Sequence, residues 1–367
     1  MRRPKSLLLV AALAAAACRG PRPEVENARC THVRAERPVR GVAVCEDAWS
    51  CTRPPDDRFD QVGLRRVAAC NAGPGPVVLY FPGMHMNSER IGDARTDLLV
   101  YLAQAGVRTW AFDYRTHAVP ADATTAALEP LRGWTAELFA RDAAWAAGFV
   151  ASIDRGPLFL AGFSYGGMLA YRLAGTSAGI AGLVILDATA GPMHPPAGAG
   201  PVIDVGSPRL PFSERARLLE AVAADPTGPS PLPGYPSAGA ALADILYTSA
   251  SFGGQGGLSD AKEGVADIQL LAQLLRTYDR WWPRAALEAK VSARRAPLPV
   301  LAFSSANMGP EWIEHVRASA TAFGGPGATV HVLPLHGHID VLVGRRAPQQ
   351  VYEPVRAWLM QAVGRGD

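Results

Sequence analysis

The fold of this 367-residue chain is decided by the stretch Leu158-Phe159-Leu160-Ala161-Gly162-Phe163-Ser164-Tyr165-Gly166-Gly167-Met168-Leu169-Ala170. The apolar residues at its start predict a buried strand, and the small residues at its end predict a helix. Between them, Gly162-x-Ser164-x-Gly166 requires a sharp turn that holds Ser164 in a strained conformation with its hydroxyl exposed. Side chains at the two glycines would collide across such a turn. We therefore predict that Ser164 is a catalytic nucleophile; the alternative is an ordinary glycine-rich turn between a strand and a helix.

Strands and helices alternate on both sides of this stretch. Residues 77–81 form a continuous apolar run, which is typical of a strand buried on both faces. A helix is expected near 93–105, a strand at 108–112, a helix carrying Trp134 and Phe149, and a strand at 182–186. The alternation predicts a mostly parallel sheet with helices on both faces, whose site lies at the carboxyl ends of the strands.

The alternation stops between residues 191 and 297, which we interpret as an inserted cap or lid. Its first half is rich in Pro, Gly and Ala, and its second half has leucines at helical spacing. The pattern resumes with a strand at 299–303, a helix near 310–323, a strand at 328–333 and a last helix near 350–363. The expected core therefore comprises residues 76–190 and 298–367.

The N-terminus has the pattern of an export signal. Residues 1–5 are positively charged, and residues 7–17 form an apolar run that is too short to span a bilayer. The sequence Ala15-Ala16-Ala17-Cys18 resembles a bacterial lipobox, so residues 1–18 are expected to be a signal peptide with Cys18 as the lipidated residue. A plain secretory signal is the alternative. We expect an exported cell-envelope protein, anchored by lipid to the outer membrane, or else periplasmic or extracellular.

The charge balance gives no indication of a nucleic-acid partner. The formal net charge is +3, and residues 1–17 contain Arg2, Arg3 and Lys5 but no acidic residue, so their removal leaves a near-neutral protein. No run of Lys and Arg with interleaved aromatic residues is present. Apart from the lipid anchor, the expected partner is a small-molecule acyl substrate; the oligomeric state is left open.

The remaining cysteines, Cys30, Cys45, Cys51 and Cys70, lie together before the catalytic region. In an exported protein, four such residues predict two disulfides, with three possible pairings. A zinc site is the competing interpretation, but the spacing lacks CxxC pairs. Residues 19–75 are thus expected to be a polar tether followed by short disulfide-linked strands. No metal or cofactor is expected.

With these elements in this order, residues 75–363 resemble the α/β-hydrolase superfamily. The resemblance implies an α/β-hydrolase fold and a general base that follows the last strands. His338, in Gly337-His338-Ile339-Asp340, is similar to the catalytic histidine context of acid lipases and related esterases. A serine hydroxyl needs such an imidazole to accept its proton. His336 is the rival candidate.

The carboxylate that completes the set is less clearly marked. The superfamily usually places it after the strand that follows the cap, where this chain has Asn307. Asp187 directly follows the strand at 182–186, a position that some members use. Asp187 is therefore the predicted acid. The first alternative is Asn307, which would orient the imidazole without a charge, and Glu311 or Glu314 are further alternatives.

The oxyanion donors implied by the resemblance are two backbone N–H groups, from Tyr165 after the nucleophile and from Met84 in Phe81-Pro82-Gly83-Met84. His85 and Asn87 are candidates for substrate binding. Together these residues predict a serine hydrolase of the carboxylesterase or lipase type. A peptidase, thioesterase or acyltransferase of the same fold is an alternative, and so is a non-catalytic binding protein, which only the absence of an acid at Asn307 favours.

Overall fold

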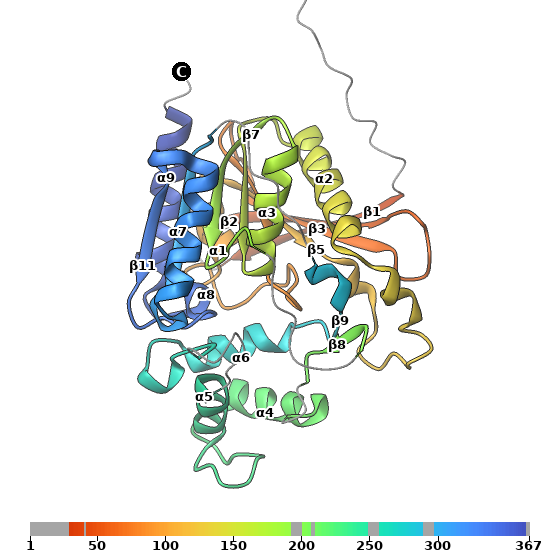
Figure 1. The fold of residues 1–367 in the computed structure, drawn as a ribbon, viewed down its shortest axis with the longest axis vertical. Helices are drawn as coiled ribbons and strands as arrows, with labels where there is room; N and C mark the ends of the chain where they lie inside the picture. The colour runs from red at the N-terminus through yellow and green to blue at the C-terminus, as the bar shows by residue number, and fades with distance from the viewer. Residues whose placement is uncertain are drawn as a thin grey trace, which may run out of the picture.

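The computed structural model describes residues 29–39, 42–191, 200–206, 210–248, 257–288 and 297–364. The predicted signal peptide, including Cys18, lies outside the described residues. Within them, a sheet of nine strands has the order β1-β2-β3-β5-β4-β6-β7-β10-β11 (Figure 1). The expected sheet with flanking helices is confirmed.

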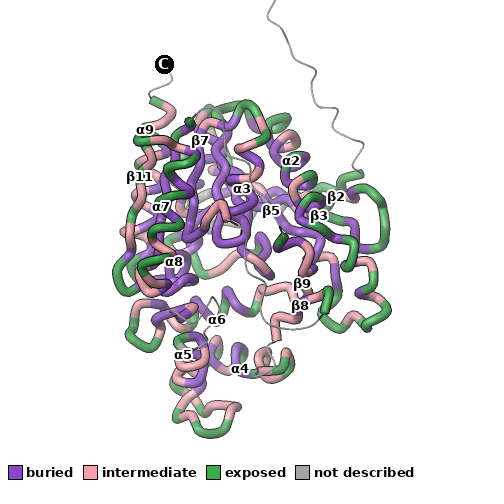
Figure 2. Tube along the Cα trace, in the orientation of Figure 1, coloured by how far each residue is buried: buried purple, intermediate pink, exposed green. Residues whose placement is uncertain are grey.

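The six strands from β5 to β11 in this order are parallel. They are β5 (Arg108–Asp113), β4 (Val77–Phe81), β6 (Leu158–Phe163), β7 (Ile180–Leu186), β10 (Val300–Ser305) and β11 (Thr329–Leu333). Every residue of β4 is buried, because alternate side chains enter the hydrophobic clusters on the two faces of the sheet. Figure 2 shows that buried residues gather in the central strands and in α3 (Tyr165–Thr176).

Helices cover both faces of the sheet. α2 (Ala136–Ile153), α3 and α7 (Pro310–Gly324) contribute to one cluster, and α1 (Leu98–Gln104) and α9 (Glu353–Gly364) contribute to the other. α1 begins later than the sequence predicts, because the Asp97 side chain accepts hydrogen bonds from the Leu99 and Val100 amides and caps the helix there. The last helix is preceded by one π-helical turn, Pro348–Tyr352.

The N-terminal strands extend the sheet in antiparallel fashion. β1 (Cys30–Val39) pairs with β2 (Val42–Thr52), β2 pairs with β3 (Gln61–Ala69), and β3 pairs with β5. Two disulfides, Cys30–Cys51 and Cys45–Cys70, link residues across these strands. The two predicted disulfides are therefore present, and the pairing that the sequence left open is settled.

The inserted segment between β7 and β10 forms a separate group of elements on one side of the core, as Figure 1 shows. It contains α4 (Phe212–Ala224), α5 (Ala238–Thr248), α6 (Ile268–Arg276) and a ribbon of β8 (Val202–Asp204) with β9 (Trp281–Pro283). We keep the name cap for it. Among the described helices, none has the length and apolar character needed to cross a membrane.

Candidate active site

The turn after β6 has the expected sharp geometry. Ser164 has φ 52° and ψ −122°, and α3 begins at the next residue, Tyr165. A Cβ atom at Gly162 would collide with the Gly166 carbonyl, and one at Gly166 would collide with the Phe81 carbonyl. Only glycine fits either position, so these two residues allow the turn to form against the end of β4.

Backbone strain gathers at this edge of the sheet. Besides Ser164, positive φ angles occur at Asp187 (49°), just after β7, and at His85 (66°), after β4. Each such conformation costs about 1–3 kcal/mol for a non-glycine residue, and such residues cluster at functional sites. Strained residues thus follow the carboxyl ends of three neighbouring parallel strands, β4, β6 and β7, as expected for a ligand site in an α/β sheet.

Asp187 and His338 are in direct contact. The His338 Nδ1 atom lies 2.6 Å from Asp187 Oδ2, and both side chains are buried. A ring that donates its Nδ1 hydrogen to a carboxylate keeps Nε2 as the basic nitrogen. The His338 ring also lies against Phe163, with 4.7 Å between ring centroids, so it sits beside the residue that precedes Ser164.

The Asp187 carboxylate is held by residues that the sequence analysis missed. Its Oδ1 accepts hydrogen bonds from the Ser305 amide (2.7 Å) and from Trp312 Nε1 (2.8 Å), and its Oδ2 also accepts from Ser305 Oγ (2.5 Å). Ser305 could have been predicted from the sequence, because it is the last residue of β10, and the carboxyl end of β10 lies beside that of β7. Nothing in the local sequence marks Trp312.

The rival residues are engaged elsewhere. The His336 ring donates from Nδ1 to the Pro334 carbonyl (2.8 Å), and the Asn307 side-chain amide donates to Asp260 of the cap. Glu311 and Glu314 are exposed, and Glu314 pairs with Arg317 on its own helix. Among the candidate acids, it is the Asp187 carboxylate that contacts the His338 ring.

Residues 83–87 follow β4 and lie next to the sharp turn at Ser164; we call them the oxyanion turn, after the role that the sequence predicts for Met84. The turn is closed by a hydrogen bond from the Met86 amide to the Gly83 carbonyl (3.0 Å). Gly83 packs so closely on Phe163 that an added Cβ would lie 2.9 Å from that ring. Met84 is in this turn, and Tyr165, as the first residue of α3, has no intrahelical acceptor for its N–H.

His85 and Asn87 are buried where the oxyanion turn meets the cap. Burial lowers the pKa of His85 to about 4, so the ring is neutral and donates from Nδ1 to the Asp279 carbonyl (2.8 Å). Asn87 Nδ2 donates to the Thr277 carbonyl (2.6 Å) and to Asp279 Oδ1 (3.2 Å). The sequence did not predict these contacts with the cap; a role in substrate binding stays a prediction.

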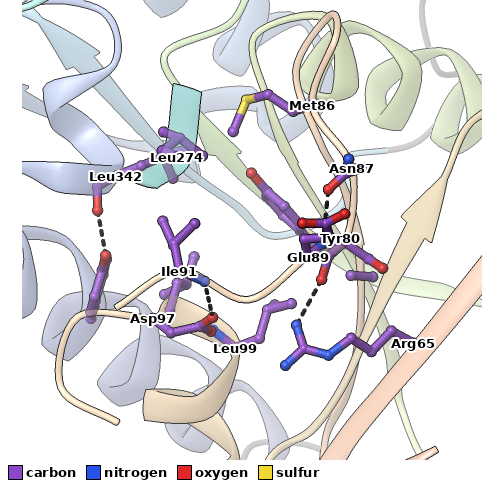
Figure 3. Close-up of a pocket in the computed structure, with 14 residues that line it drawn as sticks. Arg65, Tyr80, Met86, Asn87, Glu89, Ile91, Asp97, Leu99, Leu274 and Leu342 are labelled. Carbon is purple, nitrogen blue, oxygen red and sulfur yellow. Dashed lines mark hydrogen bonds between the residues drawn. The ribbon is translucent and has the colours of Figure 1, made fainter. Parts of the chain in front are cut away.

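A cavity of about 50 Å³ adjoins the oxyanion turn (Figure 3). It lies between the turn, α1, the cap and the segment that follows His338, and Met86, Asn87, Leu98, Leu99, Leu274 and Leu342 are among its lining residues. Met86 lines the cavity and also packs against Gly83, 3.0 Å from the position of an added Cβ. The Met86 side chain therefore contacts both the cavity and the backbone of the oxyanion turn at Gly83.

Solved structures resemble this one at low sequence identity. A Sulfolobus solfataricus protein named provisionally as a lipase superposes with a TM-score of 0.73 at 24% identity, over 91% of this chain and 99% of that one. The protein DcsB, solved with a substrate analogue, gives a TM-score of 0.50 at 17% identity, over 86% and 98% of the two chains. At these identities the likeness shows the fold alone.

Sequence comparison gives a family but no curated relative. No curated protein matches the chain significantly. The sequence profile of the alpha/beta hydrolase family matches residues 78–353, which span the sheet from β4 to β11 together with the cap. With the strand order and the turn at Ser164, this match shows that the chain belongs to the alpha/beta hydrolase family.

Proposed function

We propose that this protein is a serine hydrolase that cleaves carboxylic esters, with Ser164 as nucleophile, His338 as general base and Asp187 as the residue that orients His338. The observation that carries the proposal is the 2.6 Å contact between Asp187 and His338, beside the strained turn that presents Ser164. A carboxylate–imidazole pair next to a serine on a tight strand-to-helix turn is the arrangement that acyl transfer requires.

The proposed reaction has two halves. Ser164 Oγ attacks the ester carbonyl while His338 Nε2 takes its proton, and the N–H groups of Tyr165 and Met84 donate to the oxyanion. His338 then gives the proton to the departing alcohol, which leaves an acyl group on Ser164. Water, deprotonated by His338, attacks this acyl-enzyme and releases the acid with Ser164 restored.

The one sequence feature that favoured a non-catalytic protein was the missing acid at Asn307. The Asp187 carboxylate, bonded to His338, supplies the charge that Asn307 lacks. This contact supports an enzyme over a binding protein of the same fold.

The proposal is tested by treating the purified protein with a fluorophosphonate probe and by assaying p-nitrophenyl acetate. We expect one adduct per chain, mapped by mass spectrometry to Ser164, because the serine displaces fluoride at phosphorus only when its proton is removed by a base. A heat-denatured sample is the control. A folded protein that neither reacts with the probe nor turns over the ester would contradict the proposal.

Met86 is expected to limit the length of the acyl chain. Met86 lines the cavity and packs on Gly83, so we expect its shortening in Met86→Ala to enlarge the cavity toward the oxyanion turn. The ratio of kcat/KM for p-nitrophenyl octanoate to that for the acetate should rise by about tenfold, since each buried methylene contributes to transition-state binding. Met360→Ala, a change at an exposed methionine of α9, is the matched control and should leave the ratio unchanged.

We further propose that the protein is exported and anchored to the cell envelope through a lipid on Cys18. The two disulfides support export, because such bonds persist in oxidising compartments. The wild-type protein, expressed in a bacterium, should incorporate labelled palmitate, and Cys18→Ser should not. Equal incorporation by both would exclude Cys18 as the lipidated residue, and no incorporation by either would favour a plain secretory signal.

A further inference from the structure

Asp279 of the cap makes hydrogen bonds to both His85 and Asn87 of the oxyanion turn, beside the bond from Asn87 to the Thr277 carbonyl. The Asp279 backbone N–H donates to the His85 carbonyl (2.7 Å), and its carbonyl accepts from His85 Nδ1 (2.8 Å). Its carboxylate accepts from Asn87 Nδ2 (3.2 Å) and His117 Nδ1 (2.9 Å) through Oδ1, and from Thr116 Oγ1 (3.1 Å) through Oδ2. Asp279 therefore joins the oxyanion turn to the short helix η1 (Arg115–Ala118) after β5.

We propose that Asp279 is a positioning residue for the oxyanion hole, which acts through His85 and Asn87 to hold the Met84 N–H in place. The inference rests on the proposed function, because Met84 is an oxyanion donor only if the protein carries out the proposed acyl transfer. It gives the cap a part in catalysis that is separate from covering the substrate.

The oxyanion turn needs an external support. His85, which follows Met84 directly, has a positive φ of 66°, a conformation that the surrounding structure must stabilise. The two hydrogen bonds between the His85 and Asp279 backbone and ring atoms supply this support on one side of Met84, and the packing of Gly83 on Phe163 supplies it on the other. Oxyanion donors are effective because they are fixed in position before the charge develops.

The segments that contact or adjoin Asp279 outside the oxyanion turn are themselves held by buried ion pairs and hydrogen bonds. Arg115, the first residue of η1, is buried between Asp60 and Asp142. In the cap, Trp281 Nε1 donates to the Pro120 carbonyl (3.0 Å), and Arg280 donates to the Ala121 carbonyl (2.9 Å). Asp279 thus lies between fixed parts of the core and the cap.

His117, whose Nδ1 lies 2.9 Å from Asp279 Oδ1, is protonated at neutral pH. The hydrogen bond to Asp279, together with the charges of Asp113, Asp279 and Glu89, raises the pKa of His117 to about 9 against an opposing effect of burial. Burial raises the pKa of Asp279, while His117 and Asn87 lower it and Asp113 raises it further. Because the His117 pKa is raised in the folded state, the stabilisation is complete below pH 6.5 and is lost as the pH passes through about 9.

The first test compares Asp279→Asn with Asp225→Asn, which makes the same change at an exposed cap carboxylate that bonds within its own loop. Asp279→Asn should lower kcat for p-nitrophenyl acetate by about 10- to 100-fold with little change in KM, because only the oxyanion donor is displaced. It should still react with the fluorophosphonate to completion. Asp225→Asn should match the wild type.

The second test uses pH and a residue that is partly exposed, in case Asp279→Asn does not fold. Wild-type kcat should fall as the pH rises through about 9. His117→Lys, which keeps its charge to higher pH, should move this decline upward, and His117→Gln should abolish it at a lower kcat. Melting temperatures of the same variants are measured alongside. If His117 had a purely structural role, its substitution would change the melting temperature but would leave the pH dependence of kcat unchanged.

The outcomes separate the two proposals. A wild-type protein that does not react with the fluorophosphonate overturns the proposed function itself. A reactive wild type with unchanged kcat in Asp279→Asn, or the same alkaline decline in the wild type and both His117 variants, overturns the role of Asp279 alone.

Discussion

Ser164→Ala is expected to lower kcat for ester hydrolysis by about 10⁶-fold and to abolish fluorophosphonate labelling. Without Oγ no acyl-enzyme forms, and the residual rate comes only from substrate binding and the oxyanion donors. The variant should fold, because Ser164 makes its hydrogen bond to the Leu186 carbonyl (3.1 Å) through the backbone amide. Kinetics with p-nitrophenyl acetate, with melting temperature as the folding check, measure the effect.

Ser152→Ala is the matched control for this prediction. Ser152 is an exposed serine of α2 whose hydroxyl donates to the Phe149 carbonyl of the same helix. It should retain full labelling and turnover. If Ser164→Ala keeps either, the nucleophile is another residue and the interpretation of the Gly-x-Ser-x-Gly turn is wrong.

The parts of the molecule that follow from local pattern could be predicted from the sequence. The apolar run at 77–81 forms β4 with the predicted bounds, since a strand buried on both faces needs apolar residues throughout. The prediction of Asp187 used the rule that sites lie at carboxyl ends of parallel strands, together with the resemblance to a superfamily in which some members carry their acid at this position. That rule placed it at an edge where the structure brings it against His338.

The contacts that join distant segments could not be predicted. His85 and Asn87 have no local pattern that assigns them to Asp279, which lies far along the chain and reaches them only because the cap packs against the turn that follows β4. Cys30 and Cys45 could be assigned to disulfides but not paired, because the pairing depends on the register of antiparallel strands. Loop and cap positions depend on tertiary packing, which single-sequence periodicity does not encode.

Asp187→Asn is expected to lower kcat by about 10⁴-fold while KM stays almost unchanged. The four donors around the carboxylate explain the size of the effect. The Ser305 amide and Trp312 Nε1 both donate to Oδ1, so the asparagine oxygen must occupy that position. The asparagine NH₂ group then faces His338 Nδ1, where the carboxylate accepted a hydrogen bond.

A hydrogen-bond donor at that position favours the opposite tautomer of the His338 ring. His338 must accept at Nδ1 and carry its proton on Nε2, so it no longer takes the Ser164 proton, and no carboxylate offsets the imidazolium charge.

Trp312→Phe is the matched control, because it removes one donor from Oδ1 but leaves the carboxylate on His338. Its kcat should stay within about tenfold of the wild type, since a single hydrogen bond contributes about 0.5–1.5 kcal/mol. If both variants lose kcat equally, the activity depends on the packing around Asp187 and not on the charge of its carboxylate. If Asp187→Asn loses less than Trp312→Phe, another carboxylate serves His338.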